Sequence, residues 1–140
     1  MIPASGELES SPRAIYIGDI RKTRGLQAML ELAERTPSWN YDFIGPVSSL
    51  DQKFVDDWKN KSPASARVTF HGVLNPIESW QFAKGAWIGL TLLESTPAFI
   101  EAVPSKLYEY LYSGLAAIST PLPRCIEIIE KSKGGVIAND

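Results

Sequence analysis

The sequence predicts a three-layer α/β/α fold built on a doubly wound parallel sheet of about six strands. Short apolar segments typical of buried strands alternate along the chain with longer segments in which apolar residues recur at helical spacing. Such alternation favours parallel strands joined by right-handed helical crossovers. With 140 residues, of which 44% are apolar and 21% charged, the chain is long enough to form one domain with a substantial core.

Six segments are predicted to be strands because they are short, apolar and bounded by turn residues. Residues 14–20, AIYIGDI, end in Gly-Asp-Ile, which indicates a strand followed by a turn. Residues 86–93, AWIGLTLL, are almost continuously apolar, as expected of a strand buried on both faces. The other predicted strands are residues 41–47, 67–74, 115–120 and 134–138.

The segments between these strands are predicted to be helices. In residues 25–37 the apolar side chains share one helical face, and Pro37 ends the helix. Asn75 and Pro76 supply an N-cap and a first helical residue for a short helix over residues 75–85. The remaining predicted helices are residues 48–63, a helix that begins near Pro104, and residues 123–133.

Residues 1–13 are rich in Ser, Pro and Glu, and we expect them to form a flexible lead-in or interdomain linker. Residues 14–140 form the predicted domain. A doubly wound sheet usually has a helix over its last strand, whereas this chain ends at Asp140, directly after a predicted strand. We therefore expect a domain that is truncated at its C-terminus and belongs to a longer protein.

The bulk chemistry gives no reason to expect nucleic acid, a disulfide framework or a zinc site. The formal charge is −2 at pH 7 and the pI is near 5.4, so there is no general positive field. Cys125 and His71 are the single cysteine and histidine, too few for either kind of site. No apolar run approaches the roughly 20 residues of a membrane span, and the polar first residues do not resemble a signal peptide. The reducing cytosol is the expected compartment.

Residues 101–109, EAVPSKLYE, combine two carboxylates, a lysine and a predicted helix start at the carboxyl edge of the sheet. Open α/β sheets bind ligands at this edge. A pyrophosphate is bound by backbone N–H groups, the positive end of a helix and a cation. A ribose is bound by a carboxylate that accepts hydrogen bonds from two vicinal hydroxyls. The segment therefore meets both requirements of a nucleoside diphosphate.

If the helix opens at Pro104 or Ser105, Lys106 and Glu109 lie on one polar stripe that faces the sheet edge or solvent. A neighbouring stripe, which includes Tyr110, can pack against the sheet. The alternative is a solvated Lys–Glu pair that contributes only a few tenths of a kcal/mol.

Residues 104–120, PSKLYEYLYSGLAAIST, resemble the signature helix of the C-terminal domain of family 4 glycosyltransferases of the GT-B fold. In that family a Pro-x-Lys-x-x-Glu-Tyr segment precedes a Gly and an apolar strand. The resemblance extends from about Tyr16 to Ala138 and implies a Rossmann-like domain. It places the family's Glu-x7-Glu motif on Glu101 and Glu109.

Residues 16–25, YIGDIRKTRG, resemble the family's first strand and turn, typically Gly-Arg-Leu with a Lys-Gly several residues later. Residues 70–74, FHGVL, resemble its Phe-x-Gly strand ending. Gly18 matches the pattern, but Asp19 reverses the charge of the family's Arg. Arg24 replaces the family's Lys, a cation of different geometry.

The resemblance implies roles for these residues in binding a nucleotide-sugar donor. Glu109 would bind the ribose, and Glu101 would lie by the donor sugar near the reacting anomeric centre, as the candidate catalytic residue. Glu94 is a second candidate acid. Lys106 and Arg24 would bind the diphosphate, with Arg21 and Lys22 as further candidates. The predicted donor-binding residues are Gly18, Asp19, Arg24, Ser105, Lys106, Leu107 and Glu109.

The function implied is that of the donor-binding domain of a retaining glycosyltransferase of the hexosyltransferase class. The whole enzyme would transfer a sugar from a UDP- or GDP-sugar to an acceptor hydroxyl, in surface glycan synthesis, without a cofactor or an obligatory metal. An N-terminal domain would bind the acceptor glycan or lipid-linked glycan, so we expect this domain alone to be inactive. The expected location is the cytoplasm or the inner face of the membrane. Two alternatives stay open: a GT-B-fold nucleotide-sugar epimerase and a non-catalytic, flavodoxin-like nucleotide-binding module.

The remaining reactive side chains are predicted to be structural. His71, near the end of a strand, is expected to be a hydrogen-bonded loop or core histidine rather than a base. Cys125 has no partner in sequence that would activate it as a nucleophile. The four tryptophans occupy positions suited to packing: Trp39, Trp58, Trp80 and Trp87. We expect solvated helix faces at residues 56–57 and 127–130.

Overall fold

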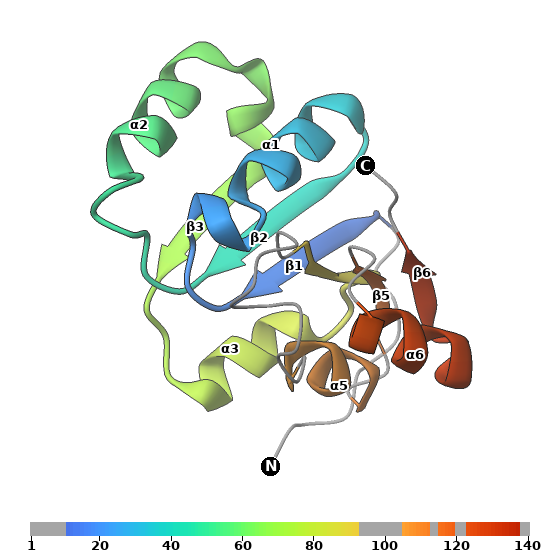
Figure 1. Cartoon of the computed structure of the whole chain (residues 1–140). Coiled ribbons are helices and arrows are strands. Elements are labelled where there is room, and N and C mark those ends of the chain that lie inside the picture. Colours follow the sequence, from blue (N-terminus) through green and yellow to red (C-terminus); the bar gives the residue numbers. More distant parts are fainter. Residues whose placement is uncertain (1–10, 93–104, 113–114, 120–122, 138–140) are drawn as a thin grey trace.

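The computed structural model of the chain describes residues 11–92, 105–112, 115–119 and 123–137. They form one sheet of six parallel strands in the order β3-β2-β1-β4-β5-β6 (Figure 1). The predicted doubly wound α/β fold is confirmed. The strands are β1 (Arg13–Ile17), β2 (Asn40–Ile44), β3 (Val68–Gly72), β4 (Ile88–Thr91), β5 (Ala116–Ser119) and β6 (Gly135–Ile137).

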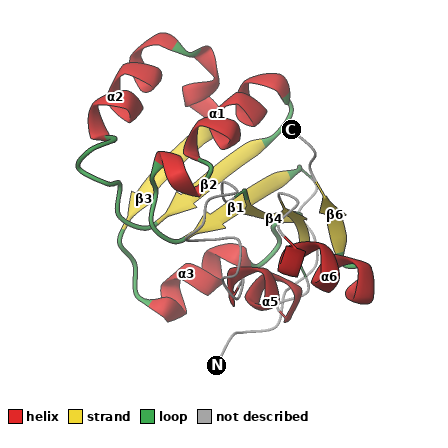
Figure 2. Ribbon diagram, viewed as in Figure 1, coloured by secondary structure: helices red, strands yellow, loops and turns green. Residues whose placement is uncertain are grey.

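Helices cover both faces of the sheet, as Figure 2 shows by colour. One face carries α1 and α2, and the other carries α3, α5 and α6 (Figure 1). All of these helices overlap segments predicted to be helical. Their bounds are α1 (Leu26–Arg35), α2 (Gln52–Lys61), α3 (Pro76–Ala83), α5 (Ser105–Tyr112) and α6 (Pro123–Ser132), with two 3-10 turns, η1 (Lys22–Arg24) and η2 (Pro63–Arg67).

The predicted ends of β1 and β2 are each three residues too late, and the second of these has a clear cause. Strand β2 ends at Ile44 because Gly45 adopts a φ of 140° and turns the chain away from the sheet. Beyond the turn, Val47 keeps only an isolated bridge to Ile20. The helix predicted over residues 48–63 begins at Gln52, and Pro63 belongs to the following 3-10 turn.

The start of α3 matches its prediction. The Asn75 side chain accepts a 2.8 Å hydrogen bond from the backbone N–H of Glu78, and Pro76 is the first helical residue. This cap fixes where the chain turns back after β3, beside the carboxyl edge of the sheet.

The core has two main clusters, one on each face of the sheet. Tyr16 of β1 packs against the buried face of α1, including Met29 and Leu30, as the helical spacing predicted. Ile15 and Ile17, which alternate with Tyr16, face the opposite layer of α3 and α5. The central strand is therefore buried on both sides, which holds its carboxyl end in a fixed position. Among the described residues, no helix is both long and apolar enough to cross a membrane.

Candidate functional site

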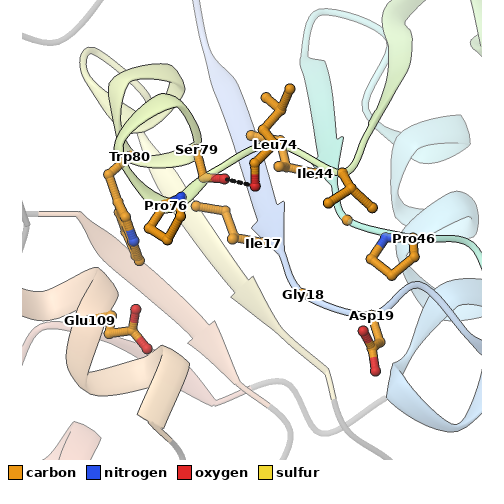
Figure 3. Close-up of a pocket in the computed structure, with 12 residues that line it drawn as sticks. Ile17, Gly18, Asp19, Ile44, Pro46, Leu74, Pro76, Ser79, Trp80 and Glu109 are labelled. Atoms are coloured by element: carbon orange, nitrogen blue, oxygen red, sulfur yellow. Dashed lines mark hydrogen bonds between the residues drawn. The ribbon is translucent and has the colours of Figure 1, made fainter.

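A cavity of about 290 Å³ opens at the carboxyl edge of the sheet, where the chain leaves β1, β2 and β3 (Figure 3). Because β1 lies between β2 and β4, the direction of strand connection reverses beside this cavity. Doubly wound sheets bind ligands at such a reversal. The walls are formed by the strand ends, the start of α3 and one residue of α5: Ile17, Gly18, Asp19, Ile44, Gly45, Pro46, Val73, Leu74, Pro76, Ser79, Trp80 and Glu109.

Backbone hydrogen bonds tie the strand ends together at the cavity wall. The N–H of Gly18 donates to the carbonyl of Ile44, and the N–H of Gly45 donates to the carbonyl of Gly72, both at 2.9 Å. A Cβ atom at Gly45 would collide with the carbonyl oxygen of Gly18. Glycine is therefore required where the first two turns approach each other.

The loop after β3 is held to α3 by Ser79, which is buried. Its hydroxyl donates to the carbonyl of Asn75 at 3.0 Å and, at 3.5 Å, to the carbonyl of Leu74 (Figure 3). Leu74 and Pro76 thereby form a fixed apolar wall of the cavity.

Tyr110 anchors α5 to the end of β1. Its side chain is fully buried, and its hydroxyl oxygen accepts a 3.2 Å hydrogen bond from the backbone N–H of Ile17. Its ring packs edge-on to Trp80 at 6.0 Å and covers Gly89, where a Cβ atom would collide with the ring. Burial raises the pKa of the Tyr110 hydroxyl far above its ordinary value, so the group stays neutral.

Glu109 precedes Tyr110 and is half-buried, with its carboxylate directed toward the cavity (Figure 3). This confirms the predicted helix geometry, in which Tyr110 packs on the sheet while Glu109 faces its carboxyl edge. Of the described residues that line the cavity, Glu109 and Asp19 are the two that are ionisable. A half-buried carboxylate beside an apolar wall suits a ligand that has both hydroxyl groups and a flat apolar ring.

Asp19, at the first turn, pairs with Arg21 at 3.1 Å, and both side chains are 44% exposed. Its backbone carbonyl accepts a 2.7 Å hydrogen bond from the hydroxyl of Tyr16. The negative charge introduced by Asp19 is thus accompanied by a cation from two residues further along the chain.

Arg24 and Lys22, two of the cations proposed from sequence, are not among the described residues that line the cavity. Arg24 is half-buried beside the phenol of Tyr16, whose pKa is nevertheless raised to about 12 because desolvation outweighs the stabilising charge of Arg24. The ammonium of Lys22 lies 4.6 Å from the ring centroid of Phe54, on the α2 side of the sheet. Arg21, in the same turn, forms an ion pair with Asp19 of the cavity wall.

The structure thus brings Gly18, Asp19 and Glu109 together at one cavity. Ser105, Lys106 and Leu107 form the first turn of α5, which begins at Ser105 as predicted. Their side chains lie outside what the structure describes, as do Glu94 and Glu101. Within the described residues, no group of three or more Cys, His, Asp or Glu side chains is arranged to hold a metal ion.

Sequence reasoning missed the cavity wall formed by Pro46, Leu74, Ser79 and Trp80. A usable signal was present for the first two, because each follows the end of a predicted strand and parallel strands share one carboxyl edge. Trp80 was assigned to packing, and it does pack on Tyr110, but it also lines the cavity.

The family model described as glycosyl transferases group 1 matches residues 2–140. The chain belongs to this family. No curated protein matches it.

Solved structures similar to this group 1 domain confirm its place in the GT-B fold. The apo form of the lipopolysaccharide outer core galactosyltransferase WaaB has a TM-score of 0.71 and 17% identity, over 99% of this chain and 41% of that chain. Anabaena HepE, in complex with UDP and glucose, has a TM-score of 0.75 and 14% identity, over 91% of this chain and 34% of the HepE chain. The C-terminal domain of LpcC from Francisella tularensis, a glycosyl transferase group 1 family protein, has a TM-score of 0.72 and 22% identity. The match covers 96% of this chain and 69% of the LpcC chain.

The group 1 domain therefore spans less than half the length of the WaaB and HepE chains. Its match to a C-terminal domain confirms the assignment, made from the Pro-Ser-Lys helix, to the C-terminal half of a GT-B glycosyltransferase. At these identities the likeness establishes the fold and not the ligand.

Proposed function

We propose that this domain binds the nucleotide of a UDP- or GDP-sugar, for a retaining transfer of the sugar to an acceptor hydroxyl. The carboxylate of Glu109 carries the proposal, because it faces a cavity at the sheet's point of reversal. The presence of UDP in the structure of HepE supports a nucleotide in this fold. Membership in the group 1 family favours a transferase over the epimerase and the flavodoxin-like module.

Each part of a nucleoside would meet a suitable partner in the cavity. Glu109 would accept hydrogen bonds from the two ribose hydroxyls. The base would lie against the apolar wall that includes Val73 and Leu74. Val73 is 73% exposed in the free domain, so a base bound there would remove apolar surface from water.

The diphosphate would lie at the start of α5. The backbone N–H groups of Ser105, Lys106 and Leu107 have no partner within the helix, and the positive end of the helix dipole lies there. Lys106 and Arg24, with Arg21 as a further candidate, would supply the charge that offsets the leaving diphosphate, in place of an obligatory metal. Glu101 would lie at the donor sugar in the complete site, with Glu94 as the alternative.

The acceptor would bind to another part of the whole enzyme, so we expect no sugar transfer by this domain alone. A place in surface glycan synthesis, in the cytoplasm or at the inner face of the membrane, accords with this role.

The proposal is tested by titrating the labelled domain with UDP, GDP and their nucleosides and following its amide resonances by NMR. Uridine or guanosine should shift residues around Leu74 and Glu109, and the diphosphate should add shifts at Ser105. Lys106→Ala should weaken binding of the nucleoside diphosphates but not of the nucleosides. Lys84→Ala, at the exposed residue that follows α3, should change the binding of neither. The absence of a response to all four ligands at millimolar concentration would refute a nucleotide site.

A further inference from the structure

A second cavity, of about 400 Å³, lies on the opposite layer of the molecule, between α2, the end of α1 and the start of η2. We call it the α1–α2 cavity. Since α1 and α2 cover the other face of the sheet from α3 and α5, the sheet separates it from the cavity beside Glu109 (Figure 1). Its principal lining residues are Glu34, Phe54, Asp57, Trp58, Lys61 and Ser62.

The apolar part of the α1–α2 cavity is aromatic. Phe54 and Trp58 are four residues apart on α2 and therefore share one side of the helix. Both rings are half-buried and pack against the core beneath them. Lys22 already lies over the ring of Phe54, so the indole of Trp58 is the better platform for a ligand.

Trp58 also carries an unexplained polar group. Its indole N–H is buried and has no hydrogen-bond partner within the part of the chain that the structure describes. Buried donors in proteins almost always have an acceptor. The N–H of Trp58 would gain an acceptor if the indole rotated so that this group reached an oxygen atom of a ligand in the α1–α2 cavity.

Charged groups of both signs surround these rings. One carboxylate oxygen of Glu34 accepts a 2.8 Å hydrogen bond from the hydroxyl of Ser62, which holds this carboxylate beside the cavity. Asp57 and Lys61, one turn apart on α2, are exposed. The rim therefore offers acceptors and a donor around an aromatic floor.

We propose that the α1–α2 cavity binds one pyranose ring of a saccharide. The C–H face of the ring would stack on Trp58, while its hydroxyls donate to Glu34 and Asp57 and accept from Lys61. The volume lies within the range of small-ligand pockets. A quaternary ammonium ion also favours aromatic rings and carboxylates, but the positive charge of Lys61 opposes it, whereas a saccharide uses all three side chains.

For a group 1 glycosyltransferase, such a ligand would be a sugar unit of a glycan held away from the donor cavity. The inference does not depend on the proposed nucleotide site, because the two cavities share no residue.

The test titrates the labelled domain with methyl glycosides of glucose, galactose, mannose and N-acetylglucosamine, and separately with tetramethylammonium. We expect at least one glycoside to shift the indole N–H resonance of Trp58 saturably, because this group gains an acceptor. The resonance is assigned by its loss in Trp58→Phe. If no glycoside shifts it, or if only tetramethylammonium does, the proposal is wrong.

Variants of α2 sharpen the test. Trp58→Phe keeps an aromatic ring but removes the N–H, and Asp57→Asn removes a charged acceptor, so each should weaken glycoside binding about tenfold. Lys53→Gln, at a position that is 92% exposed on the same helix, should leave binding unchanged. Unweakened binding by both Trp58→Phe and Asp57→Asn would contradict the assigned site. Near-ultraviolet circular dichroism checks that each variant is folded.

Discussion

The backbone N–H of Ile17 donates a 3.2 Å hydrogen bond to the hydroxyl oxygen of Tyr110, so a side chain of α5 completes the hydrogen bonding of the central strand. Alternate N–H groups along a strand point to opposite neighbours. The next N–H, that of Gly18, donates to Ile44 of β2, so the N–H of Ile17 points toward β4. The pairing of β1 with β4 ends at Ile15 and Gly89, two residues earlier. The hydroxyl of Tyr110 therefore supplies the acceptor that β4 does not provide at this point. This contact also fixes the position of Glu109, the preceding residue of α5.

Removing this hydroxyl should destabilise the domain. In Tyr110→Phe the N–H of Ile17 is left buried without an acceptor, and we expect the free energy of unfolding to fall by about 1–3 kcal/mol. Urea denaturation measures this. Tyr112→Phe is the control, because Tyr112 lies on the same helix but is 75% exposed. Equal stability of Tyr110→Phe and the wild type would show that the hydrogen bond is not needed.

The contact between Gly89 and Tyr110 should be equally sensitive to added volume. In Gly89→Ala the new methyl group would collide with the ring, and overpacking of this kind costs about 1–3 kcal/mol. Since the ring causes the cost, Gly89→Ala should destabilise less when Tyr110→Leu is also present. A double-mutant cycle by urea denaturation checks this. If the two substitutions lower the free energy of unfolding additively, the destabilisation by Gly89→Ala does not come from its contact with the Tyr110 ring.

Sequence reasoning succeeded where the determinant is local. Helical periodicity placed Tyr110 toward the sheet and Glu109 toward its edge, and the Asn75-Pro76 pair located the start of α3. It did not identify the acceptor of the Ile17 N–H, because Tyr110 lies 93 residues away and the sheet order decides which groups meet.

The positions of the cations depended on contacts that no motif shows. Lys22 lies over Phe54 of α2, and Arg24 lies beside the phenol of Tyr16. Both residues follow β1 closely in sequence, and the motif made Arg24 the main candidate for the diphosphate, with Arg21 and Lys22 as further candidates.

Glu109→Gln tests the proposed ribose contact. The amide is nearly the same size as the carboxylate but is a weaker acceptor, so nucleoside diphosphate binding should weaken by about 1–3 kcal/mol. Isothermal titration calorimetry with UDP and GDP measures the change. Glu127→Gln is a matched control, because Glu127 is 59% exposed and pairs with Lys131 on α6. An unchanged affinity in Glu109→Gln would assign Glu109 to the solvated helix face.

Alkaline pH should destabilise the domain partly through Tyr16. Burial raises the pKa of this phenol from 10.0 to about 12. Between these values the unfolded chain loses the proton while the folded domain retains it, so the contribution of Tyr16 is complete below pH 10 and is lost as the pH rises through 12. This loss amounts to about 2–3 kcal/mol.

The measurement is the free energy of unfolding as a function of pH in wild type and Tyr16→Phe. The variant should show a shallower decline over this range. Part of the slope remains, because burial also raises the pKa of Tyr110, of Tyr41 and of Cys125. Tyr112→Phe, at an exposed position, should retain the wild-type slope. Identical slopes in wild type and Tyr16→Phe would show that Tyr16 does not contribute to the decline.

Asp42, on the inner strand β2, should be important for the stability of the sheet because its carboxylate joins three strands. Its two oxygens contact the guanidinium of Arg13 on β1 at 2.9 Å and the imidazole of His71 on β3 at 2.7 Å. Arg13 also donates to the carbonyls of Phe82 and Lys84 at the end of α3. The prediction that His71 is a hydrogen-bonded structural histidine agrees with this network.

Asp42→Asn removes the negative charge that faces the guanidinium of Arg13, and its amide N–H must be directed at His71, which can accept it only through an unprotonated Nε2. Because the Asp42 side chain is only 15% exposed, water compensates poorly, and we expect a loss of about 1.5–3 kcal/mol in the free energy of unfolding. The matched substitution Asp56→Asn, at an exposed site on α2, should change stability by less than about 0.5 kcal/mol. Equal effects of the two substitutions in urea denaturation would mean that the network adds nothing beyond an ordinary surface charge.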